Sequence, residues 1–310
     1  MFGNMGRKGS PEGIQIVKET PPWVCGGTDA YLDTKAPKKI ESEEMVLFNA
    51  TSSFAGQVCL NPERQGCFSY VSAYAVPSNK GSFMYLQTKT EHRGAISRSW
   101  ALVKDDVFPM LVELVKELDL ARNNGRHSTT HGLPENFGGD VDIRYASGER
   151  ISYSDNQCPI MSSYDGQRIA DAFMAAMEGE RVDLPDTSDL REVLFREDRE
   201  DGGFTEARLV LNGDGTGTNY KRSQYKGTRV FESEKPVDAD TIAAIKGNIA
   251  SSGMLAWEGL PENDYKPMHK AEITFSFDGG RSVSVKRDTA VPYGIGNAFF
   301  SIELEVTTKH

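Results

Sequence analysis

A pentapeptide that occurs twice constrains the fold of this chain more than any other feature. Gly132-Leu133-Pro134-Glu135-Asn136 returns letter for letter as Gly259-Leu260-Pro261-Glu262-Asn263. Each copy follows a helical pattern that ends at a glycine, and each precedes an alternating strand, a tight turn and a second strand. Self-similarity of this kind indicates a repeated structural unit. The sequence therefore predicts a tandem duplication of one α+β unit.

The first unit is expected to open with strands and to continue with a helix. Alternating apolar residues predict four strands, at residues 44–48, 68–76, 82–89 and 98–103. Asp105 or Asp106 is expected to cap a helix that runs to about Ala121, with Asn124-Gly125 as its stop. A hairpin at residues 141–145 and 151–153 and a further helix at residues 165–177 complete the unit.

The second unit repeats this order in shorter form. Its strands are predicted at residues 193–196, 207–211, 220–222 and 228–231. Asp238 is expected to cap a helix that Gly247 interrupts, and the hairpin follows at residues 271–277 and 282–286. Residues 296–308 fit a helix and a strand equally well, and both possibilities stay open.

The predicted fold class is α+β, with two tandem repeats. Each repeat is expected to be an antiparallel sheet with an amphipathic helix packed on one face, in the order β-β-β-β-α-β-β, with a closing helix as an option. The expected domains are an N-terminal extension or linker at residues 1–40, a first repeat at 41–182 and a second repeat at 183–310.

The composition narrows the classes of partner. With 45 acidic and 35 basic residues among 310, the net charge is −10, so no basic face for nucleic acid or for an anionic membrane surface is expected. No apolar run approaches the roughly 20 residues of a membrane helix. Residues 1–10 lack the apolar core of a signal peptide. The expectation is therefore a cytoplasmic protein with no nucleic-acid or membrane partner and no cofactor.

Four cysteines are too few for a disulfide scaffold: Cys25, Cys59, Cys67 and Cys158. Cys59 and Cys67 flank a predicted turn and could form a bridge in an oxidising compartment, a question that the sequence leaves open. Reduced thiols fit the cytoplasmic expectation better.

One cluster has the residue types of a metal site. His127, His131 and Glu135 are spaced four apart, which on a helix would bring them to one face. The surrounding Gly, Ser and Thr residues instead predict a loop, and the second unit has no counterpart of either histidine. Exposed loop histidines are therefore the favoured interpretation, and a metal-assisted hydrolase is the alternative.

The repeated pentapeptide supplies the candidate ligand-binding residues. Turn chemistry alone accounts for its five residue types, so a structural role is favoured. As function, its acidic and amide side chains would line equivalent sites in the two units, together with nearby aromatic rings. The candidates are Trp100, Glu135, Asn136, Trp257, Glu262 and Asn263.

The hairpins that follow each helix, Ile143-Arg144-Tyr145-Ala146-Ser147-Gly148 and Ile273-Thr274-Phe275-Ser276-Phe277-Asp278-Gly279-Gly280, lie in a layout that resembles uncharacterised bacterial proteins of duplicated β-rich domains. The resemblance covers most of residues 41–310 and implies no activity and no catalytic residue. The favoured hypothesis is a non-catalytic tandem-domain protein that binds a protein or small-molecule partner in a groove between the repeats.

Overall fold

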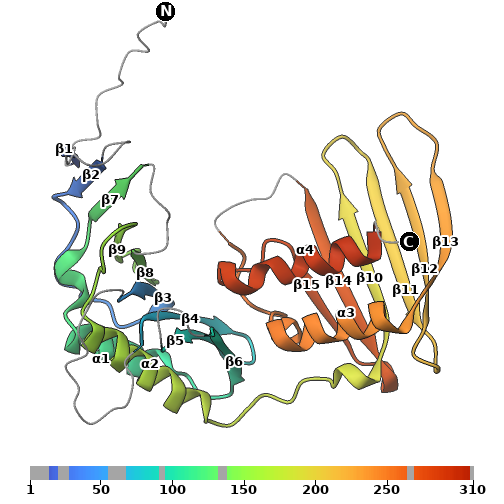
Figure 1. The fold of residues 1–310 in the computed structure, drawn as a ribbon, viewed down its shortest axis with the longest axis horizontal. Coiled ribbons are helices and arrows are strands. Elements are labelled where there is room, and N and C mark those ends of the chain that lie inside the picture. The colour runs from blue at the N-terminus through green and yellow to red at the C-terminus, as the bar shows by residue number, and fades with distance from the viewer. Residues whose placement is uncertain are drawn as a thin grey trace, which may run out of the picture. The chain divides into compact units, whose positions relative to one another are not determined.

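The computed structural model describes residues 14–19, 28–54, 68–90, 95–131, 138–263 and 269–307, which form a β-rich mixed α/β fold (Figure 1). The chain divides into two compact units. The first runs to Ala75 and includes Met84–Ser99 and Asp105–Gly179. The second comprises Val76–Phe83, Trp100–Lys104 and the chain from Glu180 onward.

The larger sheet has nine strands among the described residues. In spatial order they are β1 (Ile14–Glu19), β2 (Thr28–Asp33), β7 (Arg126–Thr130), β9 (Arg150–Asp155), β8 (Gly139–Tyr145), β3 (Met45–Ser53), β4 (Tyr70–Ser78), β5 (Gly81–Lys89) and β6 (Ser97–Val103). The pairs β2–β7, β9–β8, β8–β3 and β3–β4 are antiparallel, whereas β7 and β9 are parallel.

The smaller sheet has six strands, again among the described residues. In spatial order they are β13 (Phe231–Val237), β12 (Gly217–Gln224), β11 (Phe204–Leu211), β10 (Leu190–Asp198), β14 (Lys270–Phe277) and β15 (Ser282–Lys286). Every pair in it is antiparallel.

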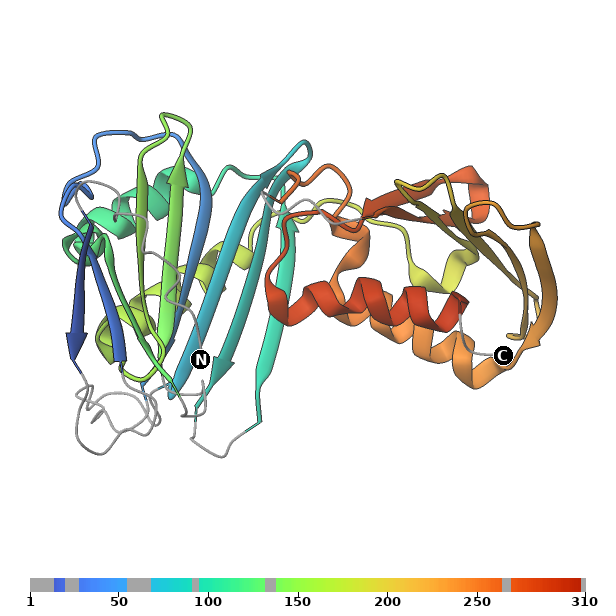
Figure 2. The ribbon, with the colours of Figure 1, turned by 90° about the horizontal axis from the view of Figure 1, so that it is seen from above.

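Two helices cover one face of the larger sheet, α1 (Phe108–Glu117) and α2 (Ser163–Met177). Alternation along β8 turns Val141, Ile143 and Tyr145 inward, where all three are buried. On α2 the buried Phe173 packs its ring 5.5 Å from that of Phe48 on β3. Figure 2 looks onto the opposite face, which α1 and α2 leave bare.

In the second unit α3 (Ala239–Ser252) and α4 (Tyr293–Thr307) lie side by side on one face of the smaller sheet (Figures 1 and 2). Residues 293–307 are helical because Phe299, Ile302 and Val306 recur at the spacing that buries one helix face. The expected cap is present, since Asp238 Oδ1 accepts from the Thr241 backbone N–H at 2.7 Å. None of the described helices combines the length and apolar character that crossing a bilayer needs.

The two sheets share one order of strands. In the larger sheet, the six neighbouring strands run β9-β8-β3-β4-β5-β6, and the smaller sheet runs β15-β14-β10-β11-β12-β13. The chain order also matches. The larger sheet is formed in the order β3, β4, β5, β6, helix α1, hairpin β8–β9 and helix α2, and the smaller sheet in the order β10, β11, β12, β13, helix α3, hairpin β14–β15 and helix α4.

The larger sheet also contains three strands that lie outside the predicted repeats. Residues 14–19 and 28–33, within the segment expected to be an N-terminal extension or linker, form β1 and β2. Residues 126–130 form β7 instead of the expected loop, because pairing with β2 and β9 supplies the hydrogen bonds that local sequence does not demand. Helix α1 also ends at Glu117, before Ala121, because Asp119 adopts a left-handed conformation.

Candidate functional site

A row of polar side chains crosses five strands on the bare face of the larger sheet. Thr51 on β3 lies directly opposite Ser72 on β4 and Asp140 on β8. Asp140 lies opposite Ser154 on β9, which in turn pairs with His127 on β7. Directly opposite residues project from the same face of a sheet. We call these five residues the polar row.

Hydrogen bonds fix most of the row. The hydroxyl oxygens of Thr51 and Ser72 lie 2.9 Å apart, and His127 Nδ1 lies 2.9 Å from the Ser154 hydroxyl oxygen. Asn49, one pair further along β3, donates from Nδ2 to Asp140 Oδ2 at 2.7 Å. These bonds hold short side chains on regular strands, so the row presents its groups in a defined geometry.

A groove of about 850 Å³ lies along the row and belongs entirely to the first unit. We call it the polar groove. Thr51, Asp140 and Ser154 of the row line it. Short polar or aromatic side chains from neighbouring positions complete the lining, including Ser53, Tyr70 and Gln87. Its volume falls within the range of known small-molecule sites, while its lining is more polar than usual.

The environment sets the charges of the groove. Partial burial raises the pKa of Asp140, and the nearby charge of Asp142 raises it further, against the effect of the Asn49 hydrogen bond. Burial likewise raises the pKa of Tyr70, so its phenol stays protonated and able to donate. Asp140 accepts the hydrogen bond from Asn49, and the protonated phenol of Tyr70 adds a donor to the same groove.

The neighbouring carboxylate, Asp142, is bonded to two arginines. Burial alone would raise the pKa of Asp142, but hydrogen bonds from Arg144 and Arg150 hold it below its ordinary value. Arg144 Nη2 lies 2.7 Å from Asp142 Oδ2, and Arg150 Nε lies 2.6 Å from Oδ1. Both carboxylate oxygens of Asp142 accept from arginines, so Asp142 serves to hold the sheet together. Among the described residues, Asp140 accepts from Asn49 through Oδ2 and has further lone pairs that can accept from a ligand.

The bare face of the smaller sheet is built differently. There a row of directly opposite residues, Glu206, Arg196, Glu272 and Lys286, alternates in charge across β11, β10, β14 and β15. Arg196 Nε donates to Glu206 Oε2 at 3.0 Å. Opposite charges on directly opposite residues attract one another. This row therefore presents alternating charges, where the polar row presents hydroxyls, a carboxylate and an imidazole.

The structure separates the two histidines of the proposed metal cluster. His127 bonds to Ser154, and His131 Nε2 lies 3.1 Å from Asp29 Oδ2. Positions four apart along an extended chain are roughly 13 Å apart, too far to share one metal ion. Glu135 lies outside the described residues. Within the described part of the chain, no group of three His, Cys, Asp or Glu side chains is arranged to hold a metal.

Three candidates of the second unit, Trp257, Glu262 and Asn263, lie in or beside the lining of one cavity. Trp257 and Asn263 line a cavity of about 550 Å³ at the start of α4. Glu262 accepts from Lys286 Nζ at 2.9 Å, and Lys286 lines the same cavity. Trp100 lies elsewhere in the second unit, where its indole N–H donates to the Ala250 carbonyl at 3.1 Å. Asn136 of the first copy, like its neighbour Glu135, lies outside the described residues.

Cys158 is an exposed free thiol in the first unit. Partial burial and the charge of Asp155 raise its pKa, so it is not an activated thiolate. Cys25, Cys59 and Cys67 lie outside the described residues, so a bridge between Cys59 and Cys67 stays a prediction.

Sequence reasoning missed the polar row, although part of its signal is visible. The alternation of Asp142 and Arg144 with apolar residues marks one face of β8 as polar. The pairing that sets Asp140 between Thr51 and Ser154 joins segments about 90 and 14 residues apart, and no local pattern encodes that register.

A comparison with protein-family models finds no match to this chain, and a comparison with curated protein sequences finds no relative of it.

Proposed function

We propose that this protein binds an uncharged, hydroxyl-rich small molecule in the polar groove of the first unit, without transforming it chemically. The observation that carries the proposal is the polar row, which crosses five strands and places Thr51, Asp140 and Ser154 in the lining of a groove of about 850 Å³. The proposal places the site inside the first unit rather than in a groove between the repeats.

The lining argues for the class of ligand. Serine, threonine and tyrosine hydroxyls both donate and accept hydrogen bonds, which matches a ligand whose own groups do both. The carboxylate of Asp140 adds an acceptor for a ligand hydroxyl. A second carboxylate, Asp155, also lines the groove, and among the described lining residues Lys89 is the single cation. This balance of charge disfavours an anionic ligand.

Binding explains the row better than catalysis does. The His127–Ser154 contact resembles a nucleophile with its base, but the register of β7 and β9 alone brings the two residues together. A working pair also needs a third group that orients the base and donors for an oxyanion. The metal-assisted hydrolase alternative rests on His127, His131 and Glu135, and the first two have separate partners.

We further propose that the two units arose by tandem duplication. The repeated pentapeptide and the shared order of strands support it. On this proposal, substitutions replaced hydroxyls by alternating charges on the bare face of the second unit, so the polar groove belongs to one copy only.

The test combines native mass spectrometry with one hydroxyl deletion. Protein purified from its expression host is measured for a retained small molecule, and neutral mono- and disaccharides are then titrated by calorimetry. Thr51→Val removes one groove hydroxyl at nearly constant shape. Loss of one hydrogen bond should weaken binding by up to about tenfold.

A matched control exists in the smaller sheet. Thr274 and Ser284 hydroxyl oxygens lie 2.8 Å apart across β14 and β15, a pair like Thr51 and Ser72. Thr274→Val should leave ligand binding unchanged. An equal loss of affinity in both variants, or no binding of any neutral hydroxylated compound by the wild type, would remove the proposal.

A further inference from the structure

The cavity of about 550 Å³ in the second unit has features that the polar groove lacks. It lies between the start of α4, the end of β15 and the second copy of the pentapeptide. Backbone pairing fixes that copy in place, because the Asn263 N–H donates to the Asp288 carbonyl at 2.6 Å and the Ala290 N–H to the Pro261 carbonyl at 2.8 Å. The cavity wall is therefore built on defined backbone.

Two buried donors at this cavity lack acceptors. Trp257 lines the cavity with its side chain only 2% exposed, and Arg287 lines it nearby. Within the described part of the chain, neither the Trp257 indole Nε1 nor the Arg287 Nε has a hydrogen-bond partner. Native proteins rarely leave buried N–H groups unpaired, so such atoms indicate a missing partner.

The cations around the cavity are already neutralised. Arg287 reaches Glu197 Oε1 with Nη1 and Glu303 Oε1 with Nη2, each at 2.9 Å. Lys286 is paired with Glu262 at 2.9 Å. Among the described residues that line the cavity, no positive charge is therefore left unpaired for an anionic ligand, and a cationic ligand would meet the two N–H donors. An uncharged acceptor fits both facts.

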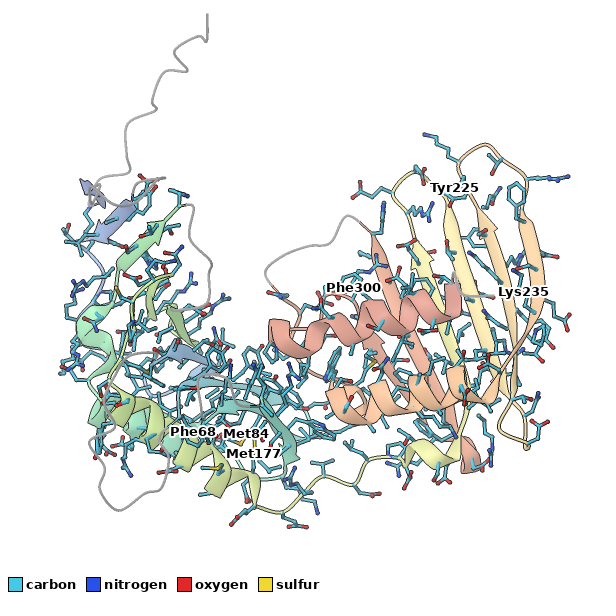
Figure 3. All side chains as sticks on the ribbon, viewed as in Figure 1. Phe68, Met84, Met177, Tyr225, Lys235 and Phe300 are labelled. Atoms are coloured by element: carbon cyan, nitrogen blue, oxygen red, sulfur yellow. The ribbon has the colours of Figure 1, made fainter. Side chains whose placement is uncertain are left out.

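Aromatic rings form the apolar wall. The Arg287 guanidinium carbon lies 5.9 Å from the Phe299 ring centre and 5.8 Å from that of Phe300. Phe299 is buried, whereas Phe300 on α4 is 53% exposed (Figure 3). Planar ligands pack well against such rings.

We propose that this cavity binds an uncharged, planar ligand that carries a carbonyl group, with the carbonyl oxygen accepting from the Trp257 indole N–H. This is a second site, in the other unit, and its ligand differs in class from the hydroxylated ligand of the polar groove. It does not depend on that groove, so each site can fail without the other.

Benzamide is the probe, because it joins a flat ring to an uncharged amide. The full chain is labelled with ¹⁵N-tryptophan, which gives indole N–H signals only from Trp23, Trp100 and Trp257. Trp257→Phe assigns the relevant signal. Benzamide is expected to move the Trp257 signal in a saturable way and to leave the Trp100 signal in place.

Two pairs of variants locate the probe. Phe300→Ala should weaken benzamide binding by about tenfold through loss of its stacking surface. Leu304→Ala, equally exposed on α4 but outside the cavity lining, should not. Gly296 lines the cavity, and a Cβ there meets only Val291 Cγ2 at 3.6 Å. Gly296→Ala should therefore bind as before, whereas Gly296→Leu should fill the space and abolish binding.

Three results would overturn the proposal. One is a Trp257 signal that does not respond to benzamide at millimolar concentration. Another is unchanged binding in both Phe300→Ala and Gly296→Leu, since exposed Phe300 can be replaced without unfolding. The third is tighter binding of benzoate than of benzamide, which would make the cavity an anion site.

Discussion

His127 occupies a position where a charged imidazole is disfavoured. Burial lowers its pKa, and the positive charge of Arg150 lowers it further, while Asp33 acts in the opposite direction. The pKa in the folded state therefore lies below the value of about 6.5 expected in the unfolded chain. Protons then bind the unfolded state more readily, so protonation of His127 favours unfolding.

This shift predicts how stability depends on pH. The contribution of neutral His127 is complete above about pH 6.5 and is lost as the pH falls through that value toward the lower pKa of the folded state. His127→Asn has no titrating group there. Urea unfolding at pH 7.5 and pH 5 should show wild type losing more stability on acidification than the variant loses. A larger loss in the variant would contradict the pKa direction.

At the scale of residues, the sequence predicts part of the candidate sites. Trp257, Glu262 and Asn263 lie in or beside the repeated pentapeptide. Trp257 and Asn263 line one cavity, and Glu262 is paired with Lys286, which lines it too. Thr51 and Asp140 could not be selected in this way. Their neighbourhood depends on strand register, which distant parts of the chain determine together.

Single glycines show how packing decides the effect of a change within a helix. Gly247 in α3 has open space where a Cβ would be. Gly166 in α2 is different, because a Cβ there would lie 2.2 Å from Cζ of the buried Phe54 ring. The intrinsic preference of helices for alanine over glycine applies to both positions, but only one has room.

The two positions give opposite predictions. Gly247→Ala should stabilise the protein by about 0.5–1 kcal/mol, because alanine loses less backbone entropy in a helix. Gly166→Ala should destabilise it by about 1–3 kcal/mol, because the Phe54 ring must move within a packed core. Thermal unfolding of both variants beside wild type measures this. If Gly166→Ala stabilised the protein, the Phe54 ring would have to move aside at little cost in free energy, which would contradict the prediction.

At the scale of elements, helices with a long, regular apolar stripe were predicted from the sequence, whereas segments without a clear apolar periodicity were not. The apolar stripes of α1 and α2 are long enough to indicate helices, and both are confirmed. Residues 126–130 carry no alternation of apolar residues, so β7 was wrongly expected to be a loop. For α4, periodicity allowed a helix or a strand, and burial of Phe299 and Ile302 against the sheet selects the helix.

At the scale of the whole chain, each unit has a core of its own. Phe173 is completely buried in the first unit beside Phe48. Phe275 on β14 is completely buried in the second. The sequence predicted a β-rich mixed α/β fold, and the structure adds β1, β2 and β7 to the strands predicted for the larger sheet.

Separate cores predict separate losses of stability. Phe173→Ala should cost about 3–5 kcal/mol in the first unit, and Phe275→Ala a similar amount in the second. Hydrogen exchange measured by mass spectrometry should show faster exchange in β3 and β8 for the first variant, and in β10 and β14 for the second. Equal acceleration in both units from either substitution would show that the chain unfolds as one cooperative body.

The parallel contact of β7 with β9 has a mechanical consequence. It holds only two residue pairs in register, whereas the antiparallel β8–β9 ladder beside it holds six. Parallel pairing is also slightly weaker per residue. A pulling force applied to β1, β2 and β7 should therefore separate β7 from β9 before it breaks the other strand pairs. His127 on β7 and Ser154 on β9 face each other across this contact. A ligand bound to the polar row would therefore hold the two strands together, so the sheet should withstand more force with a ligand in the groove than without one.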